Sequence, residues 1–112
     1  MITQAGIQRI LDLLDIDVTH IALDAGTPTE AGLQDEHFRQ ALTAPVRDGA
    51  ISIYEVYLDE TQGNGHTGGI ALIGQGTDTP GTGQLFSIDP VNIDKTSLQS
   101  LTISIEVSVE VG

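Results

Sequence analysis

The residues of this chain that could bind a metal ion or transfer a proton are chiefly its three histidines and sixteen carboxylates. His20, His37 and His66 lie far apart in the sequence, and none forms an HxH or HxxxH pair. Histidines at such spacings bind one metal ion only if the fold brings them together. Asp12, Asp15 and Asp17 lack the glycine and the distant glutamate of a calcium-binding loop. We therefore predict no metal site.

Neighbouring carboxylates could supply a general acid and a general base. Asp35-Glu36 and Asp59-Glu60 are two such pairs. Adjacent acids on an exposed loop more often only contact solvent, so we predict no acid–base site there. The chain has no cysteine nucleophile and no Gly-x-Ser-x-Gly turn that would present a catalytic serine. The sequence predicts no catalytic residue, and we expect the protein not to be an enzyme.

The segment Gly74–Gly83, GQGTDTPGTG, has the glycine content of a phosphate-binding loop. No Lys-Ser or Lys-Thr pair follows it, and no helical pattern begins there. It lies instead between two short apolar runs that are typical of strands. We predict an exposed and mobile surface loop, and no cofactor.

The charge balance restricts the partners. Sixteen acids against four bases give a formal net charge of −12, which disfavours binding to nucleic acid. No apolar run approaches the roughly 18 residues of a membrane span, and no secretion signal is recognisable, so we expect a soluble protein that does not bind membranes. The acids could attract a basic protein surface, or they could simply solvate the fold. The 112 residues predict one domain, 1–112.

The clearest structural pattern is the stretch 101–111. Its apolar residues alternate without a break with polar ones, and all of the apolar ones except Leu101 are β-branched. This predicts a long strand with one buried face. The stretch also lacks Pro, Lys and Arg, which usually protect an exposed edge. We expect part of it to pair beyond its own protomer, with pairing inside the chain as the alternative.

The remaining segments must cover that strand. Thr3 is a predicted N-cap for a short amphipathic helix over residues 4–14. Five further strands are predicted: 18–23, 33–42 after a short turn, 50–58, 70–73 and 84–88. A turn is predicted at 47–49 and a connector over 89–96. The run 50–58 is apolar on both faces, which indicates a central strand or a bulge. The predicted fold is mainly β (α+β), an antiparallel β-sandwich of five to six strands with one short N-terminal amphipathic helix.

The order of these segments resembles the small tail-collar-type proteins of tailed bacteriophages, a domain also found at the N-terminus of some phage tail fibres. The helix ITQAGIQRILDLL is followed by Thr19–Leu23, which is similar to the family's THIALG, with Asp24 in place of the glycine. Leu33-x-x-Glu36-x-x-Arg39 resembles its LxxExxR. Gly69–Leu72 resembles its EAGLF, with Gly68-Gly69 in place of Glu-Ala.

The resemblance implies a virion structural protein, assembled in the host cytoplasm, that docks onto other phage virion proteins as a fibre-to-baseplate adaptor or small tail protein. A capsid decoration protein is the alternative, and a small-ligand binding module is the third possibility. Fibre-type assemblies and capsid three-fold sites both favour a homotrimer. Leu33 and Phe38 would either anchor loops in the core or face a partner, and Glu36 and Arg39 could form an exposed ion pair. The candidate interface residues are Leu33, Glu36, Phe38, Arg39, Glu106 and Glu110.

Overall fold

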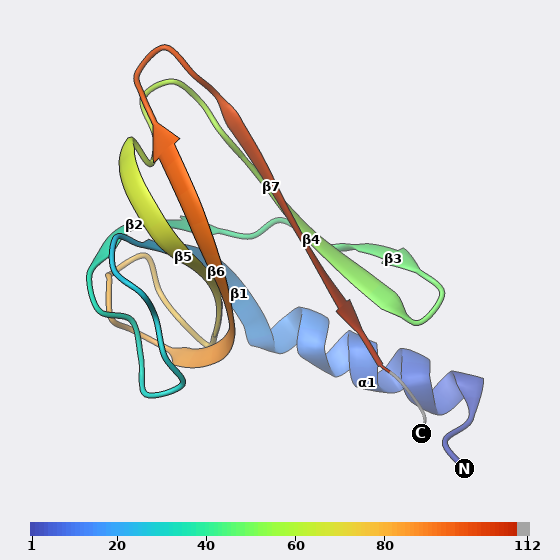
Figure 1. Ribbon diagram of the computed structural model, residues 1–112. Helices are drawn as coiled ribbons and strands as arrows, with labels where there is room; N and C mark the ends of the chain where they lie inside the picture. Colours follow the sequence, from blue (N-terminus) through green and yellow to red (C-terminus); the bar gives the residue numbers. More distant parts are fainter. Residues whose placement is uncertain (110–112) are drawn as a thin grey trace.

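The chain begins with helix α1 (Gln4–Asp17) in the computed structural model, which describes residues 1–109 (Figure 1). As predicted, Thr3 is the N-cap, and its side chain accepts a hydrogen bond from the Gly6 N–H at 3.0 Å. The predicted end at residue 14 is wrong, because α1 continues to Asp17. An acid near a helix C-terminus is unfavourable when unpaired. Asp15, however, binds the Arg47 guanidinium and the Tyr54 hydroxyl of the neighbouring sheet.

Four strands form the first sheet, in the antiparallel order β2-β1-β5-β6. They are β1 (Val18–Asp24), β2 (Glu36–Ala41), β5 (Gly65–Gly74) and β6 (Gln84–Lys95). The predicted connector over 89–96 is wrong, because β6 continues through Pro90 to Lys95. Proline is compatible with this position because β6 is an edge strand, where a missing N–H need not break the ladder. β5 likewise extends beyond the predicted 70–73 at both ends.

Three strands form the second sheet, in the order β3-β4-β7, also antiparallel. They are β3 (Val46–Asp48), β4 (Ile51–Leu58) and β7 (Leu101–Ser108). The turn predicted at 47–49 lies slightly later, since Arg47 and Asp48 belong to β3 and the turn is at Gly49-Ala50. β4 is the central strand, as one of its two interpretations required, and β7 lies at the edge. Glu110 and Val111 of the predicted closing strand lie outside the described residues.

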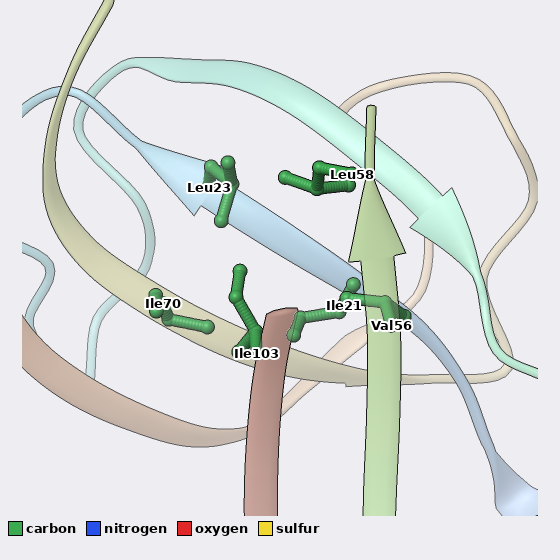
Figure 2. Close-up of a cluster of buried hydrophobic side chains, with 6 residues drawn as sticks. All are labelled: Ile21, Leu23, Val56, Leu58, Ile70 and Ile103. Carbon is green, nitrogen blue, oxygen red and sulfur yellow. The ribbon is translucent and has the colours of Figure 1, made fainter. Parts of the chain in front are cut away.

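The inner face of the second sheet is covered by two different elements. Towards one end, Val56, Leu58 and Ile103 pack against Ile21, Leu23 and Ile70 of the first sheet (Figure 2). Towards the other end, α1 lies under the strands, and the Tyr54 hydroxyl donates to Asp15 at 2.8 Å. The β7 alternation is confirmed over 101–108, where polar residues are exposed and apolar ones are buried or half-buried. The mainly-β α+β fold is also confirmed, with β3 as a seventh strand within residues 1–109.

The first sheet has a second buried face. Ala22, Ala71 and Ile73 form a small cluster there, against which Leu33, Leu85 and Ile88 pack. The loop after β1 crosses this face so closely that a Cβ at Gly68 would collide with the Gly26 carbonyl, and one at Gly69 with the Pro28 ring. The Gly-Gly pair that departs from the tail-collar pattern therefore lets this loop lie directly on β5.

Candidate interaction surface

A buried ion pair fixes the 75–83 loop to the first sheet. Arg39 binds Glu36 through two hydrogen bonds, Nε to Oε2 at 2.7 Å and Nη2 to Oε1 at 2.9 Å. The side chains are only 2% and 8% exposed, so the prediction of an exposed pair is wrong. Arg39 Nη1 also donates to the carbonyl oxygens of Thr77 and Thr82, at 3.0 and 2.9 Å. This pair thus fixes the position of the loop.

A second attachment holds the same loop beside Arg39. His20 Nε2 lies 2.9 Å from Asp78 Oδ1, and His20 Nδ1 lies 2.8 Å from the Thr19 hydroxyl oxygen. That hydroxyl oxygen also accepts the Gly76 N–H at 2.9 Å. His20 therefore forms a hydrogen bond with its sequence neighbour Thr19 and another with the loop residue Asp78. The sequence predicted a mobile loop; the structure gives the loop a dense set of hydrogen bonds, whose effect on mobility amide exchange would measure.

Four of the six candidate interface residues lie inside the protomer. Leu33, Glu36 and Arg39 line a hollow of about 390 Å³ beside the 75–83 loop. Leu33 also packs on the Ala22 cluster, and Phe38 packs against the main core. Because Glu36 and Arg39 already bind each other and the loop, their polar atoms are largely occupied. These residues shape the loop and leave little side chain for a partner.

The exposed face of the second sheet, which we term the outer face, has a different character. The pairing register places on it the residues Val46, Asp48, Ile51, Ile53, Glu55, Tyr57, Thr102, Ser104, Glu106 and Ser108. Val46 is 63% exposed and Tyr57 is 59% exposed. Val46, Ile53 and Glu106 lie in one row across the three strands. The candidate interface residue Glu106 is therefore exposed beside apolar side chains.

Most basic side chains of the chain make contacts inside the protein and do not lie on the outer face. Arg47 points inward from β3 and binds Asp15, Asp12 and Gln8 of α1. The Lys95 side chain is buried, and its Nζ donates to the Asp59 carbonyl oxygen and to Asn64 Oδ1, each at 2.7 Å. Arg39 is buried with Glu36. Three of the four basic residues thus serve internal contacts, which leaves a predominantly acidic exterior.

The contact between α1 and the second sheet also sets the ionisation of its acid. Burial alone would raise the pKa of the Asp15 carboxyl, but hydrogen bonds from Arg47, Tyr54 and Ser52 hold that pKa below its usual value of 3.8. Burial raises the pKa of the Tyr54 hydroxyl, and the neighbouring Asp15 charge raises it further. Asp15 therefore stays ionised, and it joins the helix to β3 and β4.

Metal and membrane features are absent from the part of the chain that the structure describes. No group of three or more His, Asp or Glu residues in 1–109 is arranged to hold a metal ion. No helix in that range is both long and apolar enough to cross a membrane. Each histidine instead has a local polar neighbour: Asp78 for His20, Thr67 for His37 and Asp94 for His66.

Comparison with protein-family models, with curated proteins and with solved structures found no match to this chain. The tail-collar resemblance therefore remains a prediction from the motifs. Glu106 was the one residue of the outer face within 1–109 among the candidate interface residues. The apolar residues on both sides of 50–58 were a signal for the rest of that face. One side of that run is the core, and the other side is the exposed surface.

Proposed function

We propose that this chain is a non-enzymatic structural protein of a bacteriophage virion that docks onto other virion proteins, as a fibre-to-baseplate adaptor or small tail protein. The observation that carries the docking role is the outer face, where Val46 and Tyr57 are exposed between carboxylates. Exposed apolar surface with a polar rim is typical of protein–protein contact sites. The virion setting comes from the order of the tail-collar-like motifs.

The proposed partners are other phage virion proteins with a basic surface. The acidic exterior would attract such a surface, and the attraction should weaken as salt shortens the screening length to about 10 Å at 0.1 M. The proposal includes a homotrimer, a number supplied by the resemblance alone. Light scattering of the purified chain measures it.

Capsid decoration is the second candidate, because an acidic protein whose cations point inward also suits a basic capsid lattice. Fractionated particles separate the two. Particles released from cells that carry the encoding genome are purified and split into heads and tails, and the chain is quantified in each fraction by mass spectrometry. We expect a fixed copy number in tails. Recovery with heads would favour decoration, and absence from particles at low salt would overturn the virion proposal.

A further inference from the structure

The free edge of β7 exposes a defined set of backbone groups. β7 pairs with β4 along its whole length, and it has no strand on its other side within residues 1–109. The Val109 N–H donates to the Ala50 carbonyl oxygen at 3.1 Å. In an antiparallel ladder the direction of these groups alternates, so odd-numbered β7 residues point their N–H and C=O groups towards β4. The even-numbered residues point theirs to the free edge: Thr102, Ser104, Glu106 and Ser108.

A groove runs beside this edge. A hollow of about 280 Å³ lies between β6 and β7, with Ile70, Val91, Ile103 and Ile105 as its apolar lining. Ile70 and Ile103 are buried, whereas Val91 and Ile105 are half-buried. β6 is likewise the edge of its own sheet. A strand added to β7 would therefore place every second side chain over this apolar lining.

The side chains of such a strand that point away from the groove would lie near the charged residues around the β7 edge. Asp89 and Glu106 lie at the rim of the groove, and both are exposed. Glu55 pairs with Ser104 on the outer face. No lysine or arginine belongs to the described lining. Basic side chains would complement this rim, whereas a second copy of the chain would bring more carboxylates to it.

We infer that the β7 edge accepts an extended strand from a partner protein, with apolar side chains turned into the groove and basic side chains turned to the outer face. The strand would hydrogen-bond to the even-numbered residues of β7. This deepens the docking role and rests on the proposed function for its setting. The partner strand would therefore alternate apolar residues such as valine with basic residues such as lysine.

The test uses the full chain and a blocked nine-residue peptide of alternating lysine and valine, labelled with a fluorophore. A peptide of the same composition, with its lysines and valines in separate blocks, controls for simple charge attraction. We expect the alternating peptide to bind more tightly and to slow amide exchange at Thr102, Ser104 and Glu106. Equal binding of the two peptides, or protection confined to other strands, would overturn the inference.

Ser104→Pro removes one edge N–H, and Ser104→Ala keeps it. Edge strands tolerate proline, as β6 does at Pro90. Losing one backbone hydrogen bond should weaken binding by about tenfold in Ser104→Pro, while Ser104→Ala should bind as the wild type does. Thr102→Pro is the second variant if Ser104→Pro does not fold. Unchanged binding by a folded proline variant would contradict strand addition.

Two further results separate the possible failures. If the chain without peptide forms oligomers whose β7 edge amides are protected, the occupant is a second copy and the partner inference is wrong. If the chain is present in particles yet neither protects its edge nor prefers the alternating peptide, the inference fails while the virion proposal stands. If the chain is absent from particles but still prefers the alternating peptide and protects its β7 edge, the virion proposal fails while the strand-addition inference stands.

Discussion

The two sheets of this protein differ in the face that points away from the shared core: it is covered in the first sheet and exposed in the second. β1 and β5 of the first sheet are buried on both faces, because the loops at 25–35 and 75–83 cover the side away from the core. β4 and β7 bury one face and leave the other exposed. The first sheet is therefore closed by its own chain. The second sheet leaves apolar and acidic side chains for contact with something else.

The difference lies in small residues and internal ion pairs. Glycines at 68 and 69 let a loop lie flat on β5, and the buried Arg39–Glu36 pair holds a second loop in place. The outer face has β-branched and aromatic side chains next to carboxylates, and its one nearby arginine, Arg47, points to the other side. Substitutions in the first sheet should therefore affect stability, whereas substitutions on the outer face should affect binding.

The largest effect is expected where the second sheet meets the core. Ile103→Asp places a carboxylate among Leu23, Leu58 and Ile70, and it should cost about 4 kcal/mol or more of unfolding free energy. Ser104→Asp, one residue later and exposed, should change it by less than about 0.5 kcal/mol. Urea unfolding of both variants measures the difference, and similar midpoints would contradict the assigned faces.

Breaking the ion pair of the first sheet should come next. Arg39→Ala leaves Glu36 buried without its cation and removes the bonds to Thr77 and Thr82. We expect a loss of about 3 kcal/mol and faster amide exchange in the 75–83 loop. The double variant Glu36→Leu with Arg39→Met should recover much of that stability. Slow loop exchange in Arg39→Ala would show that His20 and Thr19 suffice to hold the loop.

A smaller effect is expected at the contact between α1 and the second sheet. Asp15→Asn should lower the free energy of unfolding by about 1 kcal/mol at neutral pH, because the variant lacks the charge-assisted bonds to Arg47. The loss is modest because this ion pair is partly exposed to solvent. The folded pKa of Asp15 lies below the unfolded value of 3.8. Its stabilisation is therefore present above that value and is lost as pH falls through the folded pKa. Unfolding curves across pH should show the wild type and the variant converging in acid. A constant difference would rule out ionisation as the cause.

The smallest effect on stability is expected on the outer face. Tyr57→Ser and Val46→Thr change exposed side chains, so each should alter the unfolding free energy by less than about 0.5 kcal/mol. Both variants should still bind particles less tightly, because the apolar area of the outer face is reduced. Co-sedimentation with particles stripped of the native chain measures this. Binding as strong as that of the wild type would remove the outer face from the docking surface.

The local patterns of the sequence predicted local structure well. The alternation in 101–108 predicted β7 and its buried side, since a period of two needs no tertiary information. Thr3 predicted the start of α1, because an N-cap bonds to a backbone N–H only two or three residues away. The end of α1 could not be predicted, because the partner of Asp15 is Arg47, which is 32 positions later. β3 has only three residues, and its arginine is held by contacts with α1 that no local pattern reveals.

The candidate site was predicted only in part. Glu36 and Arg39 were correctly paired from their spacing, but their burial depends on a loop that begins more than thirty residues later. Glu106 was correctly placed on the polar side of its strand. The row that joins it to Ile53 and Val46 needs the strand order β3-β4-β7. Strand order is a property of the whole fold, and single-strand patterns do not contain it.

The alternation of the chain between the two sheets has a consequence for the order of folding. β1-β2 and β5-β6 belong to the first sheet, β3-β4 lies between them in the sequence, and β7 comes last. The first sheet cannot form until β5 reaches β1, and β4 waits for β7, since Ile51 pairs with Ser108. Pairings of such long range slow folding because the intervening chain must first be closed into a loop. On the ribosome, β4 would therefore emerge with the edge facing β7 unpaired, and it would need protection from other nascent chains until β7 arrives.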